Sequence, residues 1–256
     1  MKSRPPDGET FDDLLQGRLR ILQKVGGFRY SIDALLLARF AGEAIEGRKP
    51  GSVRALDLGS GTGVIPLVLS CYPAIASVTG LEIVPPLVEM SRRSVELNGL
   101  CDKITIIEGD IRNPPADLKP DSFDLIVSNP PYRRKGAGKL NPDRHRAMAR
   151  HEIAVSLKDI LKTTSQLIKR RGLACFIYGA FRMTDIVTGL RDSSLEPARL
   201  RYIHSRENEP AKMLLIESRE SGPPEIIIAS PLIVYRDKEN YTEEVLKIFK
   251  GPEDRL

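Results

Sequence analysis

One short segment, Asp57-Leu58-Gly59-Ser60-Gly61-Thr62-Gly63, limits the folds open to this chain more than any other. An apolar run at residues 53–58 is typical of a buried strand, and the apolar residues 64–69 that come after the glycines predict the start of a helix. A strand, a glycine-rich turn and a helix form the front of a Rossmann-type unit. The sequence therefore predicts an α/β protein with a mainly parallel sheet and helices on both of its faces.

The spacing of the glycines discriminates between cofactors. A dinucleotide fingerprint, G-x-G-x-x-G, would place its third glycine at position 64, which is Val64. The glycines instead stand at Gly59, Gly61 and Gly63, and Asp57 precedes the first of them by two residues. A carboxylate there can face the ammonium group of S-adenosylmethionine, whereas it would repel a pyrophosphate. The segment is therefore predicted to bind S-adenosylmethionine.

Two more acids end the next two expected strands. Glu82 follows residues 77–81 and can accept hydrogen bonds from both ribose hydroxyls, as the acid about twenty residues beyond such a loop often does. Asp110 follows residues 104–108 and can accept from the adenine amine. A lone acid at a strand end is more often simply solvated. Three of them around one glycine loop, in consecutive strand–helix units, favour a cofactor site.

The segment Asn129-Pro130-Pro131-Tyr132 follows a further apolar run at 123–128. It therefore lies at the carboxyl end of a buried strand, where open α/β sheets place their ligand crevice. The Asn129 side chain and the Pro130 carbonyl can accept hydrogen bonds from a planar amino group, the prolines stiffen the turn, and Tyr132 can stack on the substrate. Asn129, Pro130 and Tyr132 are the predicted catalytic residues. The alternative is an ordinary turn, since Asn-Pro and Pro-Pro are common there.

A basic stretch directly follows Tyr132. The chain carries 39 Lys and Arg against 34 Asp and Glu, and a net charge of +5 is weak support for a nucleic-acid partner. The local cluster is stronger support, because cations beside a base pocket suit phosphate contacts. The predicted RNA contacts are Pro131, Arg133, Arg134, Lys135 and Lys139. The alternative is a solvated loop without a partner. A second basic group, for which a solvated face is the better reading, comprises Arg199, Arg201, Arg206 and Lys212.

Composition and length fit one domain over residues 1–256, with a lead-in at 1–50 and a catalytic core at 51–256. The longest apolar stretches are too short to span a membrane, and the first residues lack the apolar core of a signal peptide. The three cysteines and three histidines have no metal-ligand spacing, so no metal is expected. Free thiols fit a reducing compartment, and a cytoplasmic protein is the expectation.

The remaining patterns predict a strand pair before residue 28 and a helix capped by Ser31 that ends near Ile45. The expected sheet has seven strands, is mainly parallel and carries an antiparallel hairpin at one edge. Its later strands are expected at 173–178, 200–204, 213–217 and 225–236, and later helices at 153–169, 183–190 and 243–249.

The motifs Asp57 to Gly63, Glu82, Gly109-Asp110 and Asn129 to Tyr132, in this order, resemble the class I S-adenosylmethionine-dependent methyltransferases of the amino-methylating branch. More narrowly, the chain is similar to bacterial tRNA (adenine-N6)-methyltransferases that modify the adenosine next to the anticodon of a valine tRNA. The entry segment 27–38, the segment 151–172 and the segment 231–235 support this likeness, which covers nearly the whole chain.

This resemblance implies a Rossmann-like enzyme that transfers a methyl group from S-adenosylmethionine to the N6 amino group of an adenosine in tRNA. It implies cofactor binding by Tyr30 and Asp33 near the methionine end, together with Asp57, Gly59, Gly61, Gly63, Glu82, Asp110 and Asn129. The expected partner is an RNA substrate, and the likeness implies that it is a tRNA.

Three other functions stay open. Enzymes that methylate a glutamine amide in release factors share Asn-Pro-Pro-Tyr but carry a larger helical domain before the glycine loop, where this chain has only about 50 residues. Local sequence distinguishes poorly between ribosomal RNA guanine-N2 methyltransferases and tRNA adenine-N6 methyltransferases. A non-catalytic S-adenosylmethionine-binding protein would not need Asn129 and Tyr132.

Overall fold

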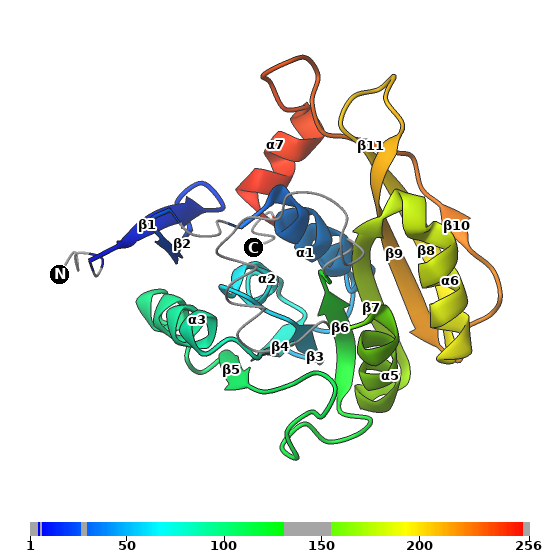
Figure 1. The fold of residues 1–256 in the computed structure, drawn as a ribbon, viewed down its shortest axis with the longest axis horizontal. Coiled ribbons are helices and arrows are strands. Elements are labelled where there is room, and N and C mark those ends of the chain that lie inside the picture. The colour runs from blue at the N-terminus through cyan, green and yellow to red at the C-terminus, as the bar shows by residue number, and fades with distance from the viewer. Residues whose placement is uncertain (1–4, 6, 27–29, 131–154, 253–256) are drawn as a thin grey trace.

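A computed structural model describes residues 5, 7–26, 30–130 and 155–252 of the chain (Figure 1). The predicted residues Pro131, Tyr132, Arg133, Arg134, Lys135 and Lys139 lie outside this described part. The strands are β1 (Glu9–Leu14), β2 (Leu19–Lys24), β3 (Val53–Leu58), β4 (Ile75–Glu82), β5 (Ile104–Glu108), β6 (Phe123–Ser128), β7 (Ile168–Gly179), β8 (Leu195–His204), β9 (Ala211–Glu220), β10 (Ile227–Ile228) and β11 (Leu232–Ile233). The helices are α1 (Ile32–Ala44), α2 (Val64–Leu69), α3 (Pro85–Leu97), α5 (Leu157–Leu167), η1 (Ala180–Arg182), α6 (Met183–Asp192) and α7 (Glu243–Lys250).

The main sheet has the strand order β10-β8-β9-β7-β6-β3-β4-β5, and β11 also pairs with β8. Strands β3, β4, β5, β6 and β7 are mutually parallel, while β9 runs antiparallel between β7 and β8. The chain begins the sheet at β3, moves outward to β5, and then returns to the other side of β3 with β6. The strand order therefore reverses between β3 and β6, which is the switch point where open α/β sheets bind ligands.

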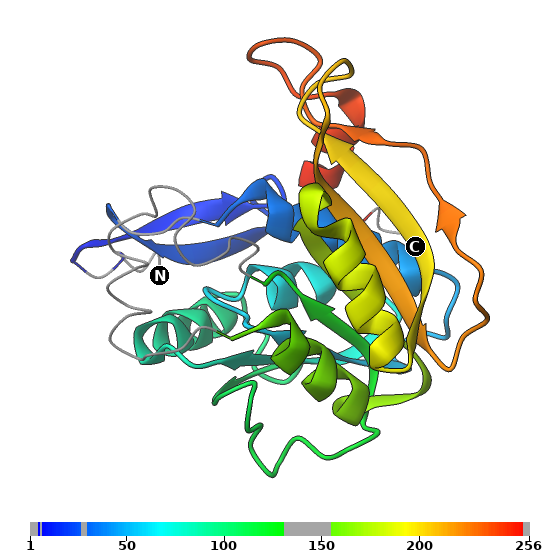
Figure 2. The same cartoon turned by 45° about the vertical axis from the view of Figure 1, so that its right-hand side comes forward.

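Helices cover both faces of the sheet (Figure 2). The core on one face joins Val53, Ala55, Leu125, Val127 and Cys175 of the strands to buried residues of α1, α2 and α3. The core on the other face joins the alternate strand residues, such as Leu56, Ile126 and Phe176, to α5 and α6. Because successive side chains of a strand point to opposite faces, this alternation is what buries both sides of the parallel strands.

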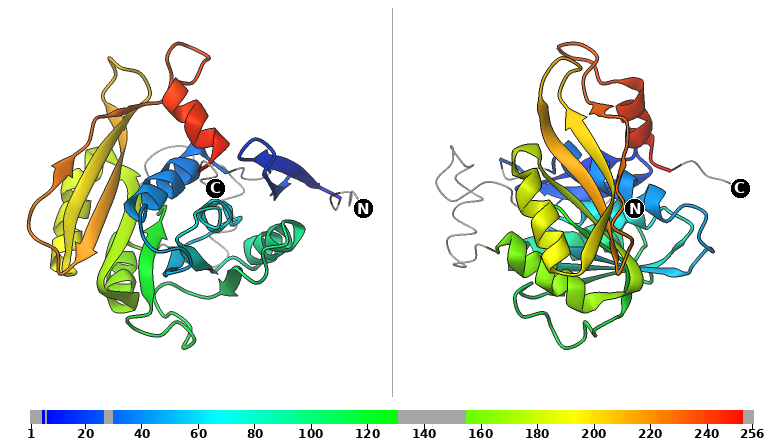
Figure 3. Two further views of the ribbon diagram at one scale, coloured as in Figure 1. Left: turned by 180° about the vertical axis from the view of Figure 1, so that it is seen from behind. Right: turned by 90° about the vertical axis from the view of Figure 1, so that its right-hand side faces the viewer.

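The β1–β2 hairpin stands apart from the main sheet, beside α2 and α3 (Figure 3). Its inner face adds Leu14, Leu19 and Ile21 to the core that contains α1. The Arg93 guanidinium of α3 donates two hydrogen bonds, of 2.7 and 2.8 Å, to the two carboxylate oxygens of Glu9. This pairing lowers the pKa of Glu9 and fixes the hairpin to α3.

Several sequence predictions are confirmed, and three need correction. The antiparallel hairpin, the early strand pair and the helix that begins after Ser31 are present, although Ser31 makes no side-chain cap hydrogen bond. The helix predicted to reach 169 ends at Leu167, because β7 already begins at Ile168 and pairs with Phe123 of β6.

The strand predicted over 225–236 is wrong in extent. Two two-residue strands, β10 and β11, replace it, each parallel to β8. Pro231 stands between them and has no N–H with which to continue the ladder. Strands β3 to β9 match seven of the expected ranges. With β10 and β11 in place of the single strand at 225–236, the main sheet of the described residues has nine strands instead of the predicted seven.

Candidate active site

The glycine loop connects β3 to α2 and is held by the neighbouring strand. The Gly59 and Ser60 N–H groups donate to the Leu81 carbonyl at 2.8 and 3.0 Å. Gly63 has φ +85° and is the N-cap residue that precedes α2, and a Cβ at this position would overlap the Ser91 hydroxyl of α3. Gly63 is therefore needed twice, for its left-handed backbone and for the close approach of α3. The sequence motif thus has a local structural cause.

Asp57 is the least satisfied polar group in this region. Its side chain is completely buried near the end of β3, and neither carboxylate oxygen has a hydrogen-bond partner within the described residues. Burial, and then the nearby charge of Glu82, raise the pKa of Asp57 well above its ordinary value. A buried carboxylate without a donor is costly, so this site favours a cationic or hydrogen-bond-donating ligand. That is the property expected of an acid that faces an ammonium group.

Glu82 ends β4 and is almost completely buried. One carboxylate oxygen accepts from the Gly61 N–H at 2.8 Å, and the other accepts from the Ile83 and Val84 N–H groups at 2.9 Å each. These bonds tie the glycine loop to the turn after β4. Two carboxylate oxygens offer about four acceptor positions, so three bonds leave room for a ligand hydroxyl.

Asp110, which follows the next strand, β5, accepts hydrogen bonds mainly from a side chain and not from the glycine loop. Its carboxylate accepts from the Arg112 guanidinium, with contacts of 2.6 to 3.1 Å, and from the Arg112 backbone N–H at 2.9 Å. The Arg112 hydrogen bonds lower the pKa of Asp110. The carboxylate therefore stays charged and is oriented by Arg112. Asp110 lies past the end of β5, at the same edge of the sheet as Glu82.

Asn129 and Pro130 follow the neighbouring strand, β6. Asp57 of β3 is level with Val127 of β6, so Asn129 lies level with the start of the glycine loop. Asn129 is half-buried and Pro130 is buried. The buried Ser128 hydroxyl donates to the Leu58 carbonyl at 2.8 Å and joins the two strand ends. The predicted catalytic and cofactor motifs are thus brought to adjacent strand ends.

Tyr30 and Asp33 lie at the entry to α1, where both are half-buried. The Tyr30 N–H donates to the Gln23 side-chain oxygen at 3.1 Å, and Gln23 reaches the Thr62 hydroxyl of the glycine loop at 3.5 Å. Gln23 is fully buried in β2 and was missed by sequence reasoning. The signal was available, because Leu19, Ile21 and Gln23 share one face of the strand and a polar residue at a core position needs partners.

The second basic group predicted from the sequence is paired within the protein. Arg199 binds Glu217 and Glu43, Arg201 binds Glu244, and Arg206 and Lys212 both bind Glu209. The Arg199 guanidinium also lies 3.9 Å from the centre of the Phe40 ring. Arg199 and Arg201 therefore join elements of the fold, whereas Arg206 and Lys212 form local pairs with Glu209, and this engagement within the protein speaks against an RNA-binding patch.

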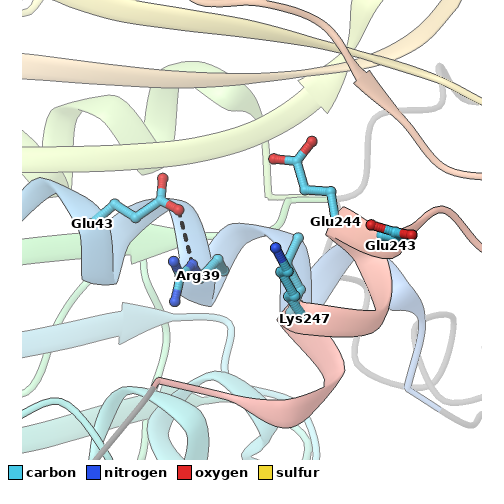
Figure 4. Close-up of a pocket in the computed structure, with 6 residues that line it drawn as sticks. Arg39, Glu43, Glu243, Glu244 and Lys247 are labelled. Atoms are coloured by element: carbon cyan, nitrogen blue, oxygen red, sulfur yellow. Dashed lines mark hydrogen bonds and ion pairs between the residues drawn. The ribbon is translucent and has the colours of Figure 1, made fainter. Parts of the chain in front are cut away.

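A hollow of about 500 Å³ lies away from the glycine loop, between α1 and α7 (Figure 4). Its charged lining comprises Arg39, Glu43, Glu243, Glu244 and Lys247. Arg39 donates to Glu43 at 2.8 Å across one turn of α1, and Glu244 binds Arg201. The hollow is therefore lined by side chains of both charges, one pair of which is bonded within α1, and it contains none of the predicted site residues.

In the part of the chain that the structure describes, no helix is both long and apolar enough to cross a bilayer. Among the same residues, no three His, Cys, Asp or Glu side chains gather as metal ligands would.

The fold and the acids around the glycine loop define a Rossmann-like methyltransferase. The model of the methyltransferase small domain matches residues 34–163, and the chain belongs to that family. The matched region runs from α1 through most of α5 and contains the glycine loop, Glu82, Asp110 and Asn129.

Curated relatives narrow this class. A protein of Porphyromonas gingivalis named tRNA1(Val) (adenine(37)-N6)-methyltransferase is 36% identical over 160 residues, which are 62% of this chain and 61% of that protein. A protein of Bacteroides thetaiotaomicron with the same name is 34% identical over 48% of this chain and 50% of its own length. A release factor glutamine methyltransferase of Geobacter sulfurreducens is 38% identical over only 33% of this chain and 28% of its own length. The chain thus spans 61% and 50% of the lengths of these two tRNA-methyltransferase relatives.

Solved structures confirm the fold. One, from Agrobacterium tumefaciens and described as a predicted O-methyltransferase, has a TM-score of 0.65 at 21% identity and covers 86% of this chain and 98% of its own. A geranyl diphosphate C-methyltransferase from Streptomyces coelicolor, solved with S-adenosyl-L-homocysteine, has a TM-score of 0.54 at 12% identity over 72% of this chain and 76% of its own.

Proposed function

We propose that this protein transfers a methyl group from S-adenosylmethionine to the N6 amino group of an adenosine in tRNA, in the anticodon loop of a valine tRNA. The observation that carries the proposal is the adjacency of Asp57 and Asn129-Pro130 on neighbouring strands at the switch point of the sheet. One strand end offers a buried acceptor for a cation, and the next offers acceptors for an amino group. The names of the curated relatives support the tRNA substrate.

The cofactor fits the residues present. The unpartnered Asp57 carboxylate would hold the ammonium group, with Tyr30 and Asp33 near the same methionine end. Glu82, which already accepts from three backbone N–H groups, would accept from one ribose hydroxyl through its remaining acceptor position, and Asp110 would accept from the adenine amine. Gly59, Gly61 and Gly63 would let the backbone approach the ligand. When bound, S-adenosylmethionine supplies a methyl group that is already activated by the sulfonium.

The acceptor side needs positioning more than acid–base catalysis. An adenine amino nitrogen is a poor nucleophile because its lone pair is delocalised into the ring. Hydrogen bonds from its two N–H groups to the Asn129 side chain and the Pro130 carbonyl would polarise it and align it for attack. Tyr132 would stack on the base, and Pro131 with Arg133, Arg134, Lys135 and Lys139 would contact the RNA. The amino proton leaves after the new bond has formed, so no strong base is required.

We extend the proposal to the organisation of the chain and its location. Residues 1–256 would form one methyltransferase domain, with the first 50 residues as a lead-in that completes the cofactor side through Gln23 and Tyr30. The enzyme would act in the cytoplasm, where tRNA is matured. A glutamine amide in a release factor is less favoured, because the relative with that name matches only a third of this chain.

The test is nucleoside mass spectrometry on bulk tRNA that lacks the modification, incubated with S-adenosylmethionine and the protein. We expect N6-methyladenosine with the wild type and none above background with Asn129→Ala. Cofactor binding by calorimetry should be retained in the variant to within a few-fold, because Asn129 would act mainly on the acceptor. Wild-type protein that binds the cofactor but makes no methylated adenosine would contradict the tRNA-adenine proposal and direct the search to ribosomal RNA and release factors.

A further inference from the structure

Phe181 is an exposed aromatic residue at the edge of the candidate active site. It lies in η1, directly after β7, and 75% of its surface is exposed. A single exposed apolar side chain needs no special explanation by itself. The position of Phe181 in the fold is informative, because β7 is hydrogen-bonded to β6, the strand that leads to Asn129 and Pro130.

The ring has a defined position at the end of β7. A Cβ built on Gly179 would lie 2.6 Å from the Phe181 Cε1 atom, so the ring covers the place that a side chain at Gly179 would occupy. Leu173, Cys175 and Ile177 face the core that contains α1, and by alternation Gly179 points the same way. Phe181 therefore covers the end of β7 on that face of the sheet.

Asn129 belongs to the same face. Leu125 and Val127 of β6 also point into the core that contains α1, and Asn129 continues their alternation. Ser128 is level with Phe176, so Gly179 lies two residues beyond the level of Asn129 on the adjacent strand. With about 3.3 Å per residue and about 4.8 Å between strands, the two backbones are roughly 8 Å apart. The ring is thus beside the place proposed for the target base, one strand further along the sheet.

We propose that Phe181 stacks on an unpaired base next to the methylated nucleotide and so positions the RNA. This inference rests on the proposed RNA methyltransferase function. Aromatic side chains beside single-stranded RNA bind bases by stacking, because every base has a flat face. An adenosine in a loop has unpaired neighbours that can splay onto such a ring. Phe181 is therefore assigned as a positioning residue, separate from the groups that hold the reacting atoms.

The neighbours of Phe181 define the kind of contact. Arg182 donates to Asp185 at 2.8 Å, and its guanidinium lies 5.2 Å from the centre of the Tyr178 ring. The adjacent cation is therefore occupied within the protein. Binding through Phe181 should depend on stacking and should change little with salt, in contrast to phosphate contacts.

The test compares Phe181→Ala, Phe181→Leu and Phe181→Trp with Ile227→Ala in steady-state methylation of a transcribed stem-loop RNA. Ile227 is a matched control, since it is 69% exposed but belongs to β10 at one edge of the sheet. We expect Phe181→Ala to raise the KM for RNA by about tenfold or more, as loss of one stacking contact does. The kcat and the affinity for S-adenosylmethionine should stay unchanged. Phe181→Trp should keep the wild-type KM, whereas Phe181→Leu should have the same raised KM as Phe181→Ala. The control Ile227→Ala should not change the KM.

A second arm identifies the stacked base. Stem-loops with an abasic site on one or the other side of the target adenosine are given to wild type and Phe181→Ala. For the wild type, one of these abasic RNAs should raise the KM by the same factor as the Phe181→Ala substitution does. For Phe181→Ala, the same abasic RNA should cause no additional rise in KM. An unchanged KM in Phe181→Ala, full rescue by Leu, or additive losses would overturn the inference while the RNA activity stands. A wild type that neither methylates nor binds RNA would overturn the proposed function and this inference with it.

Discussion

At the scale of single residues, Asp57 carries the strongest electrostatic cost in the site. Its carboxylate is fully buried, has no donor among the described residues, and lies near the charge of Glu82. Such a group destabilises a fold unless it takes a proton or meets a ligand. The stability of the protein should therefore depend on pH and on cofactor binding through the Asp57 carboxylate.

We predict that Asp57→Asn stabilises the ligand-free protein at neutral pH and weakens S-adenosylmethionine binding by about 10- to 100-fold, the range of a lost charge-assisted hydrogen bond. A raised pKa means that the folded state binds the proton more tightly than the unfolded state. Stability from this group is therefore present below about pH 4, the ordinary value for Asp, and is lost as pH rises through the folded pKa. The gain in stability of Asp57→Asn over the wild type should therefore increase as the pH rises from about 4 through the folded-state pKa of Asp57.

Thermal unfolding at several pH values, with and without the cofactor, checks this prediction. Glu108→Gln is the control, because Glu108 is an exposed acid at the end of β5. The cofactor should raise the melting temperature of the wild type and of the control much more than that of Asp57→Asn. Equal cofactor stabilisation in all three proteins would argue against contact between Asp57 and the ligand.

The residues of the site differ in how far the sequence could predict them. Asp57 stands at a fixed offset from the glycines, so local sequence was sufficient to place it beside the glycine loop, and its role in binding stays a prediction. The bonds of Glu82 to Gly61 and of Asp110 to Arg112 depend on how the loops fold back, and no periodicity contains that information. Phe181 was also missed, since its importance comes from the strand that lies beside it.

At the scale of elements, the glycine loop is braced from two directions. Glu82 holds Gly61 from the end of β4, and Gln23 of the β1–β2 hairpin connects Thr62 with the start of α1. The hairpin is therefore more than a cover for the core. It sets the position of the loop and of Tyr30 at once, through one buried amide.

We predict that Gln23→Met lowers S-adenosylmethionine affinity several-fold and stability by about 1–3 kcal/mol, because the Tyr30 N–H and the Thr62 hydroxyl lose their partner in a buried place. Ile21→Met is the matched control on the same face of β2, and an apolar exchange of this kind usually costs less than about 1.5 kcal/mol. Denaturant unfolding and calorimetric titration measure the two effects. If both variants bind the cofactor equally well, the hairpin does not brace the loop.

Long elements with a clear pattern were predicted well, and their ends were not. The buried runs at β3 and β6 and the helix α1 follow directly from apolar periodicity. The boundary at Ile168 could not be predicted, because residues 153–169 continue a helical pattern and only pairing with Phe123 starts the strand earlier. The apolar run at 225–236 looked like one strand, since its division depends on how each half meets β8.

At the scale of the whole molecule, the two groups of basic residues differ in what they bind. Arg199, Arg201, Arg206 and Lys212 bind carboxylates within the fold, so the modest net charge says little about a partner. The cluster after Tyr132 in the sequence remains the candidate for phosphate contacts. This assignment can be tested by salt dependence, which separates phosphate contacts from stacking.

We predict that Arg133→Ala/Arg134→Ala reduces the slope of log binding constant against log salt concentration by about 1.4, at about 0.7 per contact with single-stranded RNA. S-adenosylmethionine binding should be unchanged. Arg170→Ala/Arg171→Ala is the control, since these two exposed arginines lie at the beginning of β7. Fluorescence anisotropy with a labelled stem-loop at several salt concentrations measures the slope. A loss of the same size in the control would mean that only net charge matters.

The mainly parallel sheet was predictable because each strand–helix unit repeats one pattern. The antiparallel hairpin was predicted for a different reason, because two expected strands follow one another without a helix between them. The position of β9 between β7 and β8 required the three-dimensional pairing.

Under the proposed function, the reversal of strand order between β3 and β6 would divide the sheet into a half that binds the cofactor and a half that binds the acceptor. The half with β3, β4 and β5 carries Asp57, Glu82 and Asp110, and the half with β6 and β7 carries Asn129 and Phe181. Only the shared border, where Ser128 binds the Leu58 carbonyl, has to keep its geometry. Recognition of a new acceptor could therefore evolve, or be engineered, by exchanging loops of the second half while the donor half is inherited unchanged.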